Sequence, residues 1–180
     1  MSSSMATAFS YLVSTLISLY VTAVMLRLLL QWVRADFYNP VCQFLVKVTS
    51  PVLVPMRRVI PSVGKLDTAS LVLMLALEAV SVWFLGLMSP LSWAPAQIFL
   101  LAAINLLAKL LWTYFILIIV TVILSWFGQK FRHPIIPLVY QLTEPVLRPF
   151  RKIIPPISGI DLSPLLALII IRFLLLLIGR

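Results

Sequence analysis

Apolar residues fill four long runs of the chain, at residues 8–33, 70–88, 98–127 and 164–178. A helix needs about 20 apolar residues to cross the hydrocarbon core of a lipid bilayer. The first and third runs exceed this length and the fourth is short, so the helices are expected to tilt or protrude unequally. The pattern predicts an all-α membrane protein with four transmembrane helices.

The two segments that connect these helices in pairs, residues 34–69 and 128–163, are too apolar for solvated loops. Apolar residues recur in both at steps of three and four, which is typical of a helix with one apolar face. Asn39-Pro40 and His133-Pro134 predict helix starts. Because Pro51 and Pro145 follow eleven residues later, each connector is predicted to form two short amphipathic helices broken at proline, lying in the membrane interface. A re-entrant hairpin that dips into the bilayer is the alternative.

The second half of the chain repeats the first at an offset of 94 residues. Between residues 31–71 and 125–165, 13 of 41 positions are identical without a gap. The identities include prolines, a tryptophan, an arginine and an aspartate in register, which a shared apolar composition does not explain. The sequence therefore predicts two parallel two-helix repeats, residues 1–88 and 98–180, joined by a loop at 89–97.

The positive charges predict the orientation of the chain in the membrane. A repeat that crosses the bilayer twice places both connectors on the same side, and these connectors hold ten of the fourteen Lys and Arg residues. Because cytoplasmic loops are enriched in Lys and Arg, we expect the connectors in the cytoplasm and both termini on the non-cytoplasmic side of a bacterial inner (plasma) membrane. Trp32 and Trp126, near the cytoplasmic ends of the long helices, are expected to anchor the interface.

The composition argues against soluble chemistry. The chain is 62% hydrophobic and only 11% charged, whereas a soluble domain has about 25% charged residues. Its net charge of +9 would suggest a nucleic-acid partner in a soluble protein, but in a membrane protein it meets anionic lipid, and no nucleic acid is expected. With one Cys and one His, the sequence predicts no catalytic residues, no metal site and no cofactor.

Two aspartates beside the predicted helices have candidate structural roles. Asp67 and Asp161 precede the second and fourth helices and are expected as helix N-caps, as partners of Arg57 and Arg151, or as both. An ion pair of this kind would hold each connector against the helix that follows it.

Further charges lie within the predicted spans, where a charge is costly. Glu78 and Arg172 are separated by 94 residues and each lies eleven residues past its aspartate, about 16 Å along the helix. We hypothesise an intramembrane ion pair between them; in the alternative, Arg172 extends toward the outer headgroups and Glu78 is protonated. Arg27 is five residues from Trp32 and is expected to extend into the inner headgroup layer.

The most distinctive motif is PVLVPMRRVIP at residues 51–61, with its counterpart PVLRPFRKIIP at 145–155. Both are followed by an aspartate, and together with the tandem arrangement they resemble the YggT (YlmG) family of small bacterial and plastid membrane proteins. Thr68-Ala-Ser in the first copy departs from Leu162-Ser-Pro in the second. The resemblance implies an inner-membrane protein without established enzymatic activity, whose members are associated with osmotic-stress tolerance, with division or nucleoid organisation, and with cytochrome maturation.

The basic residues of the two motifs are the candidate binding residues. They are expected to contact anionic lipid headgroups and partner proteins, namely other membrane proteins or a second copy of this chain: Arg57, Arg58, Arg148, Arg151 and Lys152. The sequence thus favours a non-catalytic membrane organiser or assembly factor. A small oligomeric channel or transporter for ions or solutes is the alternative, although the third helix offers few polar positions for a conduction path.

Overall fold

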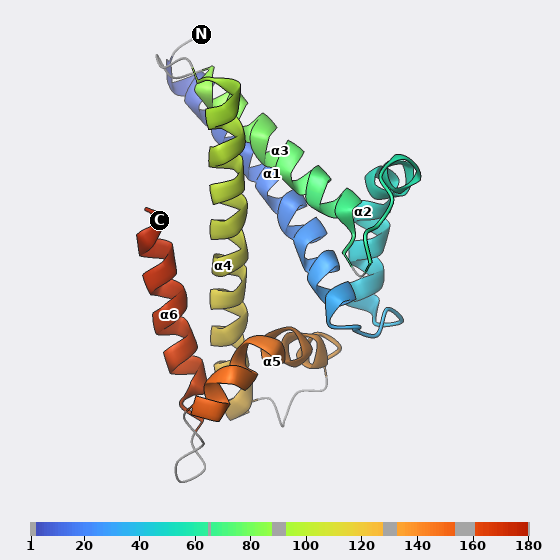
Figure 1. Cartoon of the computed structure of the whole chain (residues 1–180), viewed down its shortest axis with the longest axis vertical. Helices are drawn as coiled ribbons and strands as arrows, with labels where there is room; N and C mark the ends of the chain where they lie inside the picture. Colours follow the sequence, from blue (N-terminus) through green and yellow to red (C-terminus); the bar gives the residue numbers. More distant parts are fainter. Residues whose placement is uncertain (1–2, 65, 88–92, 128–132, 154–160, 180) are drawn as a thin grey trace. The chain divides into compact units, whose positions relative to one another are not determined.

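The long elements in the described part of the chain are all α-helices. The structure, a computed structural model, describes residues 3–64, 66–87, 93–127, 133–153 and 161–179. Figure 1 shows the helices in chain order: α1 (Ser3–Trp32), α2 (Pro40–Val59), α3 (Thr68–Gly86), α4 (Pro95–Phe127), α5 (Ile135–Ile153) and α6 (Ser163–Leu177).

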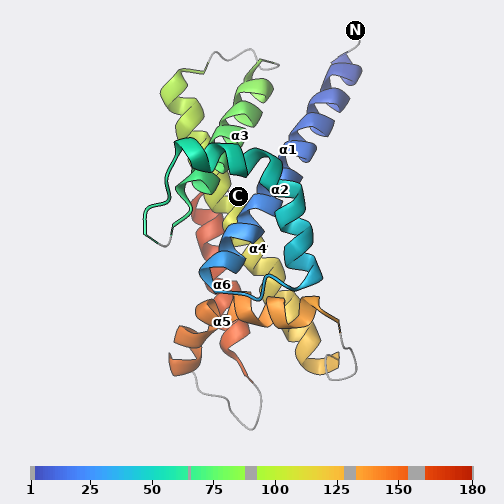
Figure 2. The same ribbon diagram turned by 90° about the vertical axis from the view of Figure 1, so that its right-hand side faces the viewer.

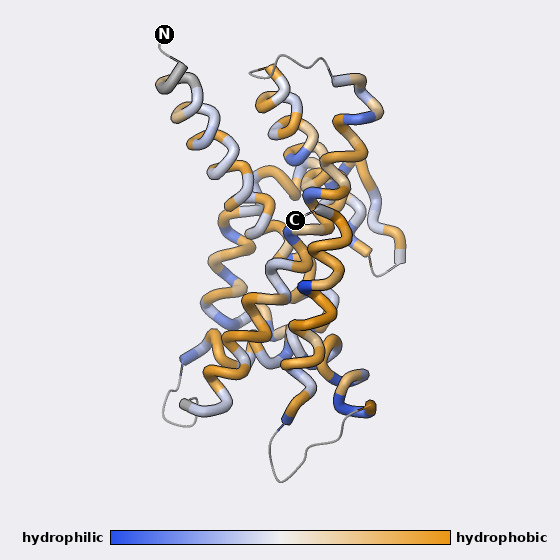
Figure 3. The backbone as a smooth tube through the Cα atoms, turned by 90° about the vertical axis from the view of Figure 1, so that its left-hand side faces the viewer, coloured by the Kyte–Doolittle hydropathy of each residue, from blue (hydrophilic) through white to orange (hydrophobic). Residues whose placement is uncertain are grey.

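Three of these helices are long and apolar enough to cross a membrane. The qualifying segments are Thr7–Trp32 in α1, Thr68–Gly86 in α3 and Pro95–Trp126 in α4. Helix α6 is equally apolar but has only 15 residues. Most residues of these segments are not buried within the structure, and Figure 3 colours many of their positions as hydrophobic. Exposed apolar surface of this extent calls for lipid around the helices, as in a membrane protein.

The chain divides into two compact units. Unit 1 comprises residues 1–28 and 45–107, and unit 2 comprises residues 29–44 and 108–180. In unit 1 the buried side chains include Val21 and Val24 of α1, Leu53 of α2, Met74 of α3 and Ala102 of α4.

Unit 2 has a contiguous hydrophobic core. Helix α5 packs on α6, and the second half of α4 completes the cluster. Its buried members are Ala108, Ile118, Leu147, Ala167, Ile171 and Leu175. Burying a Leu or Ile side chain stabilises a soluble fold by about 1.5–3 kcal/mol; within a bilayer, close packing replaces most of that contribution.

In the described part of each connector, one helix continues through its prolines, so the prediction of two short helices broken at proline was wrong. Helix α2 includes Pro51 and Pro55, and α5 includes Pro145 and Pro149. A proline removes one backbone hydrogen bond and bends a helix, but the turns on either side persist where packing holds them. Figure 2 shows α2 turning sharply part-way along its length.

The connector helices each bury one face. In α2 the buried positions recur at steps of three and four, at Cys42, Leu45, Thr49 and Leu53. In α5 they are Leu138, Val139, Leu142, Thr143 and Leu147.

Both connector helices begin where the sequence predicts a start. The side chain of Asn39 accepts a hydrogen bond from Val41 N at 2.9 Å, and that of His133 accepts one from Ile135 N at 3.3 Å.

Candidate functional site: two polar clusters on the connector helices

The end of α2 is tied to the start of α3 by a buried carboxylate. Asp67 is the N-cap of α3, where its Oδ1 accepts a hydrogen bond from Ser70 N at 3.4 Å and its Oδ2 accepts one from Ser70 Oγ at 2.6 Å. Arg57 donates from Nε to Asp67 Oδ2 at 3.2 Å, and its Nη2 donates to the same oxygen. The side chain of Asp67 is only 4% exposed and that of Arg57 is 35% exposed. The ion pair and the cap therefore coexist at Asp67.

The charge on Asp67 is stabilised by these contacts. Burial acts to raise the pKa of its carboxyl group, but the hydrogen bonds from Arg57 and Ser70 outweigh burial. The pKa consequently lies below its ordinary value, and Asp67 is ionised at neutral pH.

A buried arginine on α1 extends this polar cluster. Arg27 is 7% exposed, and its Nη1 donates to Thr49 Oγ1 at 2.6 Å and to Ser50 Oγ at 3.2 Å. Arg27 also lies near enough to Arg57 and Asp67 for their charges to act on it. Helix α2 thus offers the guanidinium hydroxyl partners within the fold, and the expectation that Arg27 extends into the inner headgroup layer stays a prediction. We call Arg27, Thr49, Ser50, Arg57, Asp67 and Ser70 the first polar cluster.

Unit 2 contains a related second polar cluster: Thr121, Thr143, Glu144, Arg151, Asp161 and Ser163. Arg151 donates from Nε to Asp161 Oδ2 at 2.9 Å and from Nη1 to Glu144 Oε2 at 2.6 Å. The side chains of Arg151 and Asp161 are 34% and 33% exposed, so this pair is more open to water than Arg57 and Asp67.

Asp161 differs from Asp67 in how it meets its helix. The N-cap of α6 is Leu162, so the expectation that Asp161 itself is the cap residue was wrong. Its Oδ1 accepts a hydrogen bond from Ser163 N at 2.9 Å. The position corresponding to Ser70 is Pro164, which has no N–H to donate. The carboxylate therefore takes the preceding N–H instead.

Both ionised partners of the second cluster are stabilised. Burial acts to raise the pKa of Asp161, but hydrogen bonds from Ser163 and Arg151 outweigh it and lower the pKa. Burial acts to lower the pKa of Arg151, but hydrogen bonds to Asp161 and Glu144 outweigh that effect and raise it. Asp161 and Arg151 are thus charged at neutral pH.

The two clusters carry opposite charge because two corresponding positions differ. Thr121 stands 94 residues after Arg27, and its Oγ1 lies 3.1 Å from Thr143 Oγ1, so a hydroxyl replaces the guanidinium. Glu144 stands 94 residues after Ser50, so a carboxylate replaces a hydroxyl. Two arginines and one aspartate give the first cluster a net charge of +1. One arginine and two carboxylates give the second cluster −1.

The five predicted binding residues fall into two groups. Arg57 and Arg151 are held by carboxylates within the fold. Arg58, Arg148 and Lys152 have exposed side chains. The predicted anchors Trp32 and Trp126 are also exposed, at 67% and 76%. The spacing alone did not separate a structural arginine from an adjacent exposed one.

Glu78 and Arg172 belong to different units. Glu78 is 4% exposed on α3, whereas Arg172 is exposed on α6. Their ion pair stays a prediction, and its test is given in the Discussion.

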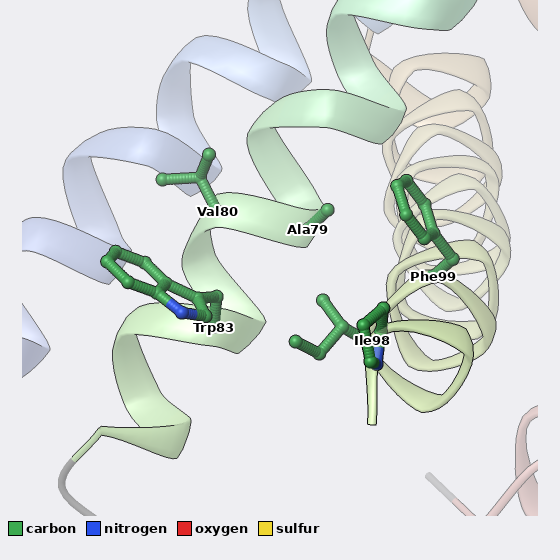
Figure 4. A pocket seen from close by; sticks show the side chains of 6 residues that line it. Ala79, Val80, Trp83, Ile98 and Phe99 are labelled. Atoms are coloured by element: carbon green, nitrogen blue, oxygen red, sulfur yellow. The ribbon is translucent and has the colours of Figure 1, made fainter. Parts of the chain in front are cut away.

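An apolar groove lies between α3 and α4 in unit 1. The groove has a volume of about 220 Å³ and is lined by Ala79, Val80 and Trp83 of α3 and by Pro95, Ile98 and Phe99 of α4, whose side chains are drawn in Figure 4. Its lining offers no titratable or nucleophilic group. Among the described residues, no set of three or more His, Cys, Asp or Glu side chains is placed to hold a metal ion.

Comparison with known proteins identifies relatives along most of the chain. The CCB3/YggT family model matches residues 6–88 and 100–180. An Escherichia coli K12 protein named "Uncharacterized protein YggT" is 39% identical over 165 residues, covering 90% of this chain and 84% of the relative. An uncharacterized protein of Pseudomonas aeruginosa is 41% identical over 178 residues, covering 93% and 86%.

A more distant match is the chloroplast protein CCB3 of Arabidopsis thaliana, whose name describes it as a cofactor assembly protein. It is 35% identical over 76 residues, which is 40% of this chain and 42% of that protein. No solved structure matches the chain. The match of the family model to both halves, together with the two bacterial relatives, shows that the chain belongs to the CCB3/YggT family.

Proposed function

We propose that this chain is a non-catalytic, multi-pass protein of the bacterial inner membrane that organises or assembles other membrane proteins. The proposal rests on a difference between adjacent basic residues. Arg57 and Arg151 form ion pairs with carboxylates within the fold, whereas the neighbouring Arg58 and Lys152 are exposed. Each connector thus holds a fixed scaffold residue next to a cation that is accessible to partners. The name of the chloroplast relative, a cofactor assembly protein, supports an assembly-type role.

The proposed architecture has four crossings, arranged as two repeats of residues 1–88 and 98–180. Its support is the family model, which matches two segments that begin 94 residues apart. Helix α6, with 15 residues, is about 22 Å long and crosses if the bilayer thins locally or flanking residues extend the span. The excess of Lys and Arg in the connectors supports a cytoplasmic location for them and an outer location for both termini.

The exposed cations would hold the connectors at the anionic inner leaflet. Each Lys or Arg near such a surface contributes about 1 kcal/mol of attraction. A partner membrane protein, or a second copy of this chain, would then meet the connectors in the plane of the headgroups. In this proposal, tolerance of osmotic stress depends on the assembled partners and not on solute flux through the chain.

A matched pair of double variants tests the proposal. Arg58→Gln with Lys152→Gln removes the exposed pair, and Arg34→Gln with Lys47→Gln removes two other exposed connector cations. In-cell crosslinking followed by mass spectrometry should recover fewer partner proteins from the first variant and the normal set from the control. Proteoliposomes of the parent chain should show no ion or solute flux. Equal partner loss in both variants, or flux that follows substitution of Glu78, would refute the proposal, and the flux result would favour the channel.

A further inference from the structure

The first polar cluster holds more positive charge than its own acids neutralise. In unit 1 the acidic residues are Asp67 and Glu78. Glu78 lies eleven residues beyond Asp67, about 16 Å along α3, and Asp67 is engaged by Arg57. Arg27 therefore adds a second cation to a site with one local carboxylate. A buried cation is stable only when an anion or strong hydrogen-bond acceptors compensate it.

Hydrogen-bond donors converge around Arg27. A guanidinium carries five N–H donors, and Thr49 and Ser50 occupy those of Nη1. Tyr20 lies two turns earlier on α1, near enough for the charge of Arg27 to act on it. Its hydroxyl group is buried and has no hydrogen-bond partner among the described residues. Tyr20 and the remaining N–H groups of Arg27 thus form a donor set with positive charge.

The level of the cluster along the helices suits a lipid headgroup. Asp67 precedes the apolar segment Thr68–Gly86, so it lies where α3 would leave the hydrocarbon. Arg27 lies close to Asp67, which places its guanidinium at the same level. The half-buried Ser50 and the 35% exposed side chain of Arg57 give the cluster an open edge.

We propose that Tyr20, Arg27, Ser50 and Arg57 bind one phosphate group, supplied by the headgroup of an anionic phospholipid. The planar fork of an arginine matches the geometry of phosphate oxygens, and the hydroxyl groups supply further donors. The second polar cluster does not bind phosphate, since Thr121 replaces Arg27 and Glu144 repels an anion. The inference rests on the proposed function and deepens its lipid association by assigning it one specific site, in the first half of the chain alone.

The experiment measures ligand-dependent thermal stability of the full chain in non-ionic detergent at constant ionic strength. The probes are short-chain phosphatidylglycerol, short-chain phosphatidylcholine and inorganic phosphate. At about five times its dissociation constant, phosphatidylglycerol should raise the Tm by about 2–4 °C in a saturable manner. Phosphatidylcholine should give a smaller rise. If inorganic phosphate raised the Tm equally and saturably, the phosphate site would stand, but the proposal that a lipid headgroup is its ligand would be overturned.

Three variants locate the effect. Arg27→Gln should abolish the saturable shift. Tyr20→Phe removes only the unpartnered hydroxyl group and should fold normally, while weakening phosphatidylglycerol binding about 3- to 10-fold. Tyr11→Phe alters a tyrosine that is 71% exposed and should leave binding unchanged.

The outcomes separate this inference from the proposed function. A full shift in both Arg27→Gln and Tyr20→Phe would overturn the phosphate site. If, in addition, the Arg58→Gln, Lys152→Gln double variant lost the shift, lipid would be held only by the exposed surface, and the proposed function would stand. If Arg27→Gln does not fold, Tyr20→Phe and Arg27→Lys, which keeps the charge but loses the fork, decide between these results.

Discussion

Arg57 and Asp67 join the last turn of α2 to the first turn of α3, through a 3.2 Å hydrogen bond from Nε to Oδ2. The same bond, at 2.9 Å, joins Arg151 and Asp161. The two pairs differ in burial, because the side chain of Asp67 is 4% exposed and that of Asp161 is 33% exposed. Charge interactions strengthen as water is excluded, so the two pairs should contribute unequally to stability.

We therefore expect Asp67→Asn to destabilise the chain more than Asp161→Asn. The first substitution leaves the partly buried Arg57 without its anion and should lower the free energy of unfolding by about 1–3 kcal/mol. The second should lower it by at most about 1 kcal/mol, since water screens the exposed pair. Denaturant titration in micelles, followed by tryptophan fluorescence, measures both values. Equal losses, or a larger loss at Asp161, would contradict the expected ranking.

The stability should also depend on pH through Asp67. Its pKa in the folded chain lies below the ordinary value of 3.8, so folding favours the ionised form. The resulting stabilisation is fully present above about pH 5 and is lost as the pH falls through 3.8 toward the folded pKa. Unfolding measured between about pH 6 and about pH 3 should show a steeper loss for the parent than for Asp67→Asn. Parallel curves would show that another group sets the acid limit.

Arg27 and Thr49 should be energetically coupled. Their side chains are joined by a 2.6 Å hydrogen bond between residues that are 7% and 0% exposed. A double-mutant cycle with Arg27→Gln and Thr49→Val should give a coupling of about 0.5–3 kcal/mol in the free energy of unfolding. Thr121→Val with Thr143→Val provides the matched cycle in unit 2, where no charge is involved and the coupling should be smaller. Additive losses at Arg27 and Thr49 would argue against the contact.

The hypothesis of an ion pair between Glu78 and Arg172 has its own test. Glu78→Gln and Arg172→Met should each lower the stability of the detergent-extracted chain, because each leaves the other charge within the apolar region. The double variant should recover part of the loss, since neither charge then remains. Purely additive losses of stability in the double variant would contradict an ion pair between Glu78 and Arg172.

Cysteine labelling tests the proposed orientation. Cys42 is fully buried, and burial, followed by the charge of Asp36, raises the pKa of its thiol, so the native chain should react slowly with maleimide. In a Cys42→Ser background, Tyr38→Cys and Met5→Cys introduce thiols at positions that are 88% and 63% exposed. A charged maleimide added outside intact spheroplasts should label Met5→Cys alone, and lysis should admit it to Tyr38→Cys. The reverse pattern would place the connectors outside the cell.

The apolar runs predicted the long helices well, because the ends of those runs are set by chemistry that is local in sequence. The run at residues 70–88 corresponds to α3, Thr68–Gly86, and the offset at its start is explained by Asp67, which caps the helix from the preceding position. The short fourth run corresponds to α6. In both cases an aspartate just before the run, Asp67 or Asp161, accepts a hydrogen bond from a backbone N–H of the first turn.

The connectors and Arg27 were harder to predict, because their structure depends on contacts between distant segments. Pro51 and Pro145 appeared as breaks in the sequence, yet buried side chains such as Leu53 and Leu147 lie on the turns that follow them. The depth of Arg27 was judged along α1 alone, which omits Thr49 on the facing turn of α2. The sequence does contain one signal: the residue 94 positions after Arg27 is the uncharged Thr121, so the charge at Arg27 is present in the first half only.

Because the two polar clusters differ in charge, a charged partner can distinguish one half of the chain from the other. Two identical halves would offer a partner two interchangeable ways to dock. A site of +1 in one half and −1 in the other makes these two poses unequal in energy for any charged partner. If the halves are the repeats that the sequence predicts, the differences at Arg27/Thr121 and Ser50/Glu144 alone account for this inequality.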